Sequence, residues 1–315
     1  MGRAGLTRLV RAATTTLTIG RTQMTESTRS KPKLFRRKWG WGIAIFAMVL
    51  LVAWMFSELR NSRAQRRAVQ SVRQLGGWAS YDYQVHSQGN FKNAQHPRPE
   101  WLRRIAGDDF TIDVVSMGLP RDGQNDGFTD EEARDIQGMT ALVSLELPNT
   151  SLTDAGVAYF TDLTSLRFLN IRHAHVSDQG LASLNQLRQL EFLDLNGNLI
   201  TDNGLQHLSR MSRLVSLNLG GTQVTHIGLK HIAGLKNLRI LILFGTDVSD
   251  TGLAHIAQLK NLRGLNLSET QITDSGLHHL TRLTKLERIW LKTPSVTEAG
   301  VDELRAALPE CEIVR

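Results

Sequence analysis

The sequence predicts an α/β solenoid, a horseshoe with a concave parallel β-sheet and short convex helices, preceded by one transmembrane helix. Two observations lead to this prediction. Residues 142–308 repeat a single pattern without a slip, and its period of 24 is the spacing from Leu142 to Leu166. Ahead of them, residues 39–57 form an uncharged, largely apolar run. A fixed period of this size is the signature of stacked coils, and an apolar run of this length is typical of a membrane-spanning helix.

The repeated unit combines leucines, hydroxyl residues and glycine at fixed positions. Each unit opens with L-x-x-L-x-L or a close variant, and its first leucine is Leu142, Leu166, Leu190, Leu214, Leu238, Leu262 or Leu286. A hydroxyl residue then recurs in every unit, as Thr153, Ser177, Thr201, Thr225, Ser249, Thr273 and Thr297. Glycine recurs three positions later, as Gly156, Gly180, Gly204, Gly228, Gly252, Gly276 and Gly300. Aspartate follows the hydroxyl residue in five units, whereas His226 and Glu298 depart from this pattern.

The unit predicts one strand and one helix per coil. L-x-L alternation is typical of a short strand with one buried face. The Ser or Thr caps the start of a helix, for example over Gly204–Ser209, and the Asp meets the positive end of its dipole. Strands stack about 4.8 Å apart whereas helices need about 10 Å, so the stack must curve. We interpret the recurring glycine as a position with no room for a Cβ against the next coil, and assign these scaffold residues no chemistry.

These motifs resemble the leucine-rich-repeat family, in its T-D-x-G-L subclass, over residues 142–308. Seven copies in register make the resemblance highly specific. The chain is similar to bacterial proteins that carry such repeats behind an N-terminal anchor. The subclass also occurs in F-box-type ubiquitin-ligase receptors, but an apolar segment stands here where the F-box would be. The resemblance implies a horseshoe that binds a protein.

Both ends of the repeat array are predicted to be covered. Residues 110–141 form a degenerate capping repeat with a strand over Val115–Leu119, because Thr129 lies one period before Thr153. Pro309 ends the last helix, and residues 309–315 are predicted to supply a closing strand over Cys311–Val314.

The segment 58–109 is interpreted as a juxtamembrane helix, a stalk and an N-terminal cap. Arg63–Leu75 is a basic amphipathic helix that ends at two glycines. Trp78–Gln84 alternates like a strand. A helical turn is expected over Trp101–Ile105.

Charge is divided unevenly along the chain. The tail of residues 1–38, expected to be disordered, holds ten Lys and Arg against one acid. Residues 58–73 carry a net charge of +4 and residues 74–315 a net charge of −6. A nucleic-acid-binding protein should carry its basic excess on the folded domain. Here the excess flanks the apolar run, which indicates membrane insertion and argues against nucleic-acid binding.

Residues 39–57 are therefore predicted to be an uncleaved, single-pass signal anchor in contact with the lipid bilayer. The run spans about 28 Å at about 1.5 Å per residue, and no small-x-small cleavage site follows Ala53. Six cations precede it closely and five follow, so positive-inside counting favours a cytoplasmic N-terminus and external repeats by a narrow margin. Residues 1–23 resemble a transit peptide, or translation starts at Met24.

The outward strand positions are the predicted partner-binding surface. Most are small or polar, as a solvated sheet face requires. The exceptions are large or charged residues: Phe168, Phe192, Ile240, Ile242, Phe244, Arg288, Trp290 and Lys292. Aromatic residues and arginine are enriched at binding hot spots, and apolar clusters mark contact sites. The alternative is ordinary scatter on a large surface, with Glu269 and Glu287 holding the cations.

The remaining polar and reactive residues indicate no catalytic activity, cofactor, metal site or small-molecule substrate. His207, His231, His255 and His279 recur with the period of the repeat, but convex helices about 10 Å apart cannot bring them into one metal site. Asp108 and Asp109 are interpreted as a turn or cap. The single cysteine, Cys311, is expected to be a small buried hydrophobe. No nucleotide-binding, hydrolase or metalloprotease motif occurs.

The predicted function is a membrane-anchored interaction module that binds an unidentified protein on its concave face. The alternative is a structural envelope protein that self-associates through the solenoid, using an uncovered last coil. An enzyme would have to lie within residues 78–115, which are too few for a typical catalytic domain.

Overall fold

The computed structural model describes residues 46–50, 53, 62–81, 113–123 and 125–315. The chain divides into two units, Met1–Ala53 and Trp54–Arg315. In the first unit, residues 46–50 and 53 are helical, and Phe46, Met48, Val49 and Leu50 are exposed. None of the helices formed by described residues is long and apolar enough to cross a membrane. Most of the predicted span, residues 39–57, lies outside the described residues, as do residues 1–38 and the turn expected over Trp101–Ile105.

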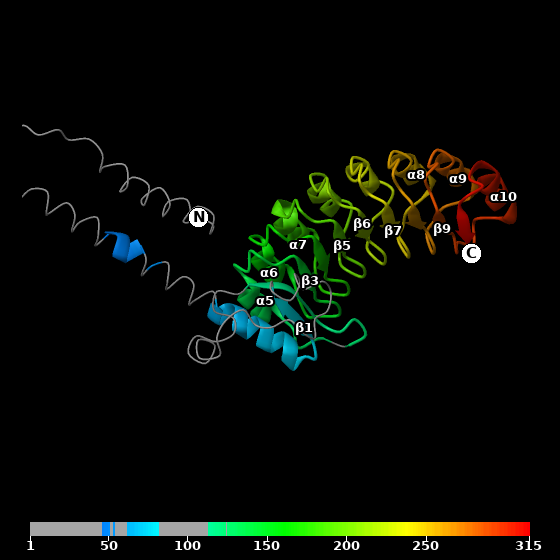
Figure 1. Ribbon diagram of the computed structural model, residues 1–315. Helices are drawn as coiled ribbons and strands as arrows, with labels where there is room; N and C mark the ends of the chain where they lie inside the picture. Colours follow the sequence, from blue (N-terminus) through cyan, green and yellow to red (C-terminus); the bar gives the residue numbers. More distant parts are fainter. Residues whose placement is uncertain (1–45, 51–52, 54–61, 82–112, 124) are drawn as a thin grey trace, which may run out of the picture. The chain divides into compact units, whose positions relative to one another are not determined.

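The second unit is built on one ten-stranded sheet whose strands follow the order of the sequence (Figure 1). Strand β1 is antiparallel to β2, and all later neighbours are parallel. The strands are β1 (Trp78–Tyr81), β2 (Val114–Gly118), β3 (Ser144–Glu146), β4 (Phe168–Asn170), β5 (Phe192–Asp194), β6 (Ser216–Asn218), β7 (Ile240–Ile242), β8 (Gly264–Asn266), β9 (Arg288–Trp290) and β10 (Glu312–Val314). The predicted parallel sheet is confirmed.

Helices lie opposite the strands in the coils (Figure 1). The α-helices are α5 (Asp130–Ile136), α6 (Asp154–Val157), α7 (Asp178–Ser183), α8 (Asp250–Ile256), α9 (Asp274–Leu280) and α10 (Glu298–Ala307). The 3₁₀ helices are η1 (Ala158–Phe160), η2 (Leu184–Gln186), η3 (Gly204–Leu208) and η4 (Gly228–His231). The helix predicted over Gly204–Ser209 is therefore the 3₁₀ helix η3, one residue shorter than expected.

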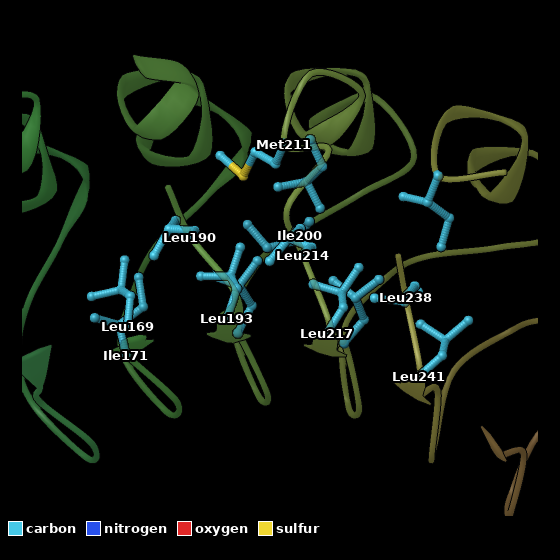
Figure 2. Packing of buried hydrophobic residues seen from close by; sticks show 14 of the residues in the cluster. Leu169, Ile171, Leu190, Leu193, Ile200, Met211, Leu214, Leu217, Leu238 and Leu241 are labelled. Carbon is cyan, nitrogen blue, oxygen red and sulfur yellow. The ribbon is translucent and has the colours of Figure 1, made fainter. Parts of the chain in front are cut away.

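The core lies between the strands and the helices. Leu193, Leu217 and Leu241 project from successive strands into this layer and are fully buried (Figure 2). Leu214 and Leu238 reach the same layer from the loops that precede the strands. Burying one such side chain stabilises the fold by about 1.5–3 kcal/mol, so the recurring leucines hold each coil to its neighbours.

The repeated aspartates join one coil to the next. Asp178 accepts hydrogen bonds from the backbone N–H and the hydroxyl of Thr201, at 2.8 and 2.6 Å. The same pair of bonds recurs in six links: Asp130–Thr153, Asp154–Ser177, Asp178–Thr201, Asp202–Thr225, Asp250–Thr273 and Asp274–Thr297. The sequence predicted that these carboxylates meet a helix dipole, and in the structure each also accepts hydrogen bonds from the following coil.

The recurring glycine makes room for this link. A Cβ added to Gly204 would lie 2.3 Å from Oδ1 of Asp178. The predicted lack of space for a Cβ is confirmed, and the neighbouring aspartate is what fills that space.

The first coil is covered by the chain that precedes it. A helix over residues 62–74 buries Ala68, Val69 and Val72 against the core. Its Arg67 forms an ion pair with Asp135 of α5, at 2.7 Å. Strand β1, within the predicted strand Trp78–Gln84, extends the sheet beyond β2.

The last coil is covered too. Leu304, Leu308 and Cys311 are buried, and β10 pairs with β9. Arg315 forms an ion pair with Glu298. The core of the last coil is therefore closed, whereas β10 is the end strand of the sheet and pairs among the described strands with β9 alone.

Candidate functional site

The outward side chains form rows across the sheet face, because strands one repeat period apart pair in register. The first row is Ser144, Phe168, Phe192, Ser216, Ile240, Gly264, Arg288 and Glu312. The second row is Glu146, Asn170, Asp194, Asn218, Ile242, Asn266, Trp290 and Val314. Phe244 and Lys292 stand two residues beyond Ile242 and Trp290, where the chain leaves the strands.

The eight predicted binding residues divide into two groups along these rows. Phe168 and Phe192 lie on the adjacent strands β4 and β5. The other six lie on or just after β7 and β9. Strand β6 separates the groups with the small polar side chains of Ser216 and Asn218.

Phe168 and Phe192 form a stacked pair. Their ring centroids are 4.1 Å apart and their planes differ by 4°. Both side chains are half-buried. Each ring therefore covers one face of the other, which leaves less apolar surface for a partner than the sequence suggested.

A second apolar cluster, here called the C-terminal patch, consists of Ile240, Ile242, Phe244 and Trp290. Ile240 is 42% exposed and Phe244 is 38% exposed, whereas most large apolar side chains of the described repeats are buried, Leu199 and Ile227 being the other exceptions. Between Ile240 and Trp290 lies Gly264, on β8. A Cβ added to Gly264 would lie 3.8 Å from Cγ1 of Ile240 and 3.9 Å from Cζ3 of Trp290. The indole ring thus leans across β8 toward Ile240, with bare backbone between the two.

Cations border the C-terminal patch. The guanidinium carbon of Arg288 lies 5.7 Å from the centroid of the Trp290 ring, within reach of a cation–π contact. Arg288 also donates to Glu312 from Nε at 2.7 Å. Lys292 is exposed and has no carboxylate at ion-pair distance among the described residues.

The acids that hold these cations differ from those expected. Glu287 pairs with Arg263 at 2.5 Å instead of with Arg288. Arg288 is held by Glu312, and Val314 lies beside Trp290 at the edge of the patch. Glu312 and Val314 were not predicted from the sequence, although the repeat gives them: they lie one period after Arg288 and Trp290.

Apart from Phe168 and Phe192, the N-terminal half of the sheet face is polar and internally paired. Glu146 pairs with Arg121 at 2.8 Å. Asp194 is buried and accepts a hydrogen bond from the backbone N–H of Asn196 at 3.0 Å. Burial raises the pKa of Asp194, against the opposing effects of that bond, of Asn218 and of the charge on Arg172. Arg172 donates from Nη2 to the carbonyl of Arg121 at 2.6 Å, whereas its buried Nε has no hydrogen-bond partner.

The histidines and the cysteine lie away from the sheet face. His207, His231, His255 and His279 are half-buried in or beside the helices. Within the described parts of the chain, no three His, Cys, Asp or Glu side chains gather closely enough to hold a metal ion. Burial, and secondarily Glu312, raises the pKa of the Cys311 thiol to about 11, so it stays protonated at neutral pH.

Comparisons with known proteins agree with this architecture. A family model described as "Leucine Rich repeat" matches residues 162–184, 186–209 and 258–281. The crystal structure of internalin C2 from Listeria monocytogenes is similar, with a TM-score of 0.50 and 24% identity over 64% of this chain and 80% of that chain. A second internalin from the same organism, inlF, gives a TM-score of 0.48 and 22% identity over 57% of this chain and 56% of that one. No curated protein matches the sequence significantly. The chain thus contains leucine-rich repeats and has the corresponding solenoid fold.

Proposed function

We propose that the protein is a membrane-anchored interaction module that binds a protein partner on the concave sheet face of its leucine-rich repeats. Residues 39–57 are the proposed anchor, with the N-terminus cytoplasmic and the repeats external. Binding, rather than catalysis, is proposed because the sheet face offers a surface and no reactive group. The thiol of Cys311 lies away from this face and is protonated at neutral pH, and the acids of the face are mostly paired with neighbouring residues.

One observation supports the binding surface above the others. The C-terminal patch exposes Ile240 and Phe244 beside the half-buried Ile242 and Trp290, on a sheet whose other outward residues are mainly polar or paired. Exposed apolar clusters rimmed by polar residues mark interaction sites. A sheet held by core leucines is also rigid, so binding costs little ordering of the backbone.

Trp290→Ala tests this proposal. Trp290 has the largest side chain of the patch, and ordering it costs little rotamer entropy. If it is a hot spot, the change weakens partner binding by about 2 kcal/mol or more. The measurement is recovery of a cross-linked or co-purified protein partner from solubilised membranes, followed by affinity measurement with that partner.

His255→Ala is the matched control. His255 lies in α8, on the side of the coil opposite the strands, so its loss should leave affinity unchanged. Both variants must keep the circular-dichroism spectrum of the natural chain. Lost binding in the His255 variant with retained binding in the Trp290 variant would mean that the helical side is the binding surface.

A further inference from the structure

The loops that lead into strands β6 to β9 carry a concentrated positive charge. Residues 209–215, 233–239, 257–263 and 281–287 hold eight cations and one acid, Glu287. The cations are all exposed: Arg210, Arg213, Lys236, Arg239, Lys260, Arg263, Arg282 and Lys285. We call this set the basic flank. Within the described chain, only Arg263 of this set forms an ion pair, with Glu287.

The basic flank is continuous with the C-terminal patch. Arg239 and Arg263 immediately precede Ile240 and Gly264. The two arginines are neighbours, because the carbonyl of Arg239 accepts a hydrogen bond from the N–H of Arg263 at 2.7 Å. A ligand lying on the patch therefore meets positive charge at the edge where the strands begin, from Arg239, which forms no ion pair among the described residues, and from Arg263, which is paired with Glu287. Arg288 and Lys292 add positive charge beside Trp290.

Resting on the proposed function, we propose that the patch binds an acidic segment of a partner protein and receives one large apolar side chain over Gly264. The apolar side chain packs between Ile240 and Trp290, where Gly264 leaves the backbone of β8 uncovered. Carboxylates next to it in the segment lie toward Arg239 and Lys292. Attraction between complementary charges steers the encounter, and apolar contact supplies the affinity.

The charge distribution favours a short acidic protein segment over a nucleic acid. Residues 74–315 carry a net charge of −6, which repels a long polyanion, while the basic flank concentrates eight cations in four loops. The patch also includes the aliphatic side chains of Ile240 and Ile242, which offer no aromatic face for base stacking.

Gly264→Leu tests the inference by filling the space over β8. Gly264 has no left-handed backbone conformation, and its Cβ position has only ordinary contacts, so the substitution should fold. The probe is a displayed library of random peptides of about ten residues, long enough to cross several strands about 4.8 Å apart, selected on the detergent-solubilised full chain. We expect selected peptides to be acidic around one large apolar residue, and Gly264→Leu to weaken their binding at least about tenfold.

Three further variants make the result specific. Ser144→Leu places the same side chain in the same row on β3, and should leave peptide affinity unchanged. Gly264→Ala adds only a Cβ and should weaken binding less than Gly264→Leu does. Such a graded effect would show that the lost affinity comes from filling the space over β8 and not from misfolding. Arg239→Gln should lower affinity at low salt and have little effect at high salt, whereas Arg188→Gln, on an earlier loop, should have no effect.

Neutral or basic selected peptides, or equal binding by the Gly264→Leu variant, would overturn the inference. So would binding of a single-stranded oligonucleotide or of vesicles of anionic lipid that Gly264→Leu abolishes. A separate outcome would contradict the proposed function: the Trp290→Ala variant still binds the natural partner with unchanged affinity. If the Trp290→Ala variant no longer binds that partner while acidic peptides bind the Gly264→Leu variant as tightly as the natural chain, only the inference fails.

Discussion

At the scale of single residues, the second outward row contains one buried carboxylate, Asp194, at a position that other coils fill with an asparagine. Asn170, Asn218 and Asn266 each accept a hydrogen bond from the backbone N–H two residues later. Asp194 makes the same bond to Asn196, at 3.0 Å. It differs in carrying a charge that its burial disfavours, which raises its pKa. The local geometry therefore suits an amide, and the carboxylate costs stability when ionised.

We expect Asp194→Asn to raise the melting temperature at neutral pH. The folded state holds the Asp194 proton more tightly than the unfolded state, so the natural chain loses stability as pH rises above the ordinary pKa of 3.8. The variant lacks this loss, and its advantage should shrink as pH is lowered toward that value. Thermal unfolding across this pH range measures the effect.

Asp247→Asn is the control, because Asp247 is exposed and should change stability by less than about 0.5 kcal/mol. A less stable Asp194→Asn variant at neutral pH would show that Arg172 and Asn218 outweigh burial.

At the scale of the coil, the aspartate links explain why three positions recur together. The aspartate bonds the next coil, the Ser or Thr donates to it, and the glycine leaves room for the carboxylate. Periodicity predicted that these residues are scaffold, but it could not show that they act between coils. The one interrupted link is at His226, opposite Ser249, whose side chain makes no capping hydrogen bond.

Restoring that link should stabilise the protein. Ser249 has the same extended backbone as the other hydroxyl positions. A Cβ added to Gly252 would lie 3.0 Å from Cα of His226, just as one added to Gly228 would lie 3.0 Å from Cα of Asp202. His226→Asp should therefore add two hydrogen bonds to a charged acceptor, worth about 1–2 kcal/mol in this half-exposed site. Denaturant unfolding at neutral pH measures the gain.

Asp202→Ala, which removes the preceding link to Thr225, should cost a similar amount. If the His226→Asp variant is no more stable than the natural chain, the links contribute less than their geometry indicates.

At the scale of the whole molecule, the sequence predicted the architecture well and the site only partly. Leucine spacing determined which side chains face the core, because a slip of one residue would exchange the faces. Contacts between side chains on different strands could not be derived in the same way. The sequence thus suggested neither that Phe168 and Phe192 cover each other nor that Trp290 leans over Gly264. Such contacts depend on rotamers, which the repeat pattern leaves open.

The membrane anchor remains a prediction, since most of residues 39–57 lies outside the described residues. Its described part, residues 46–50 and 53, is helical and exposes Phe46, Met48, Val49 and Leu50. Basic segments on both sides of an apolar run are typical of a membrane anchor, and apolar side chains exposed together are stable only when something covers them. The lipid bilayer is the proposed cover.

Alkaline carbonate washing of cell membranes tests this proposal. The full chain should stay in the membrane pellet. The wash disrupts charge pairs at the membrane surface, but it does not offset the free-energy cost of moving a largely apolar span into water. A chain without residues 1–57 keeps every described strand and should pass into the supernatant with its circular-dichroism spectrum unchanged. Val49→Arg with Leu50→Arg should weaken retention, because each arginine at the centre of a span costs about 2.5–3.5 kcal/mol. Release of the natural full chain by the wash would show that residues 39–57 do not anchor it.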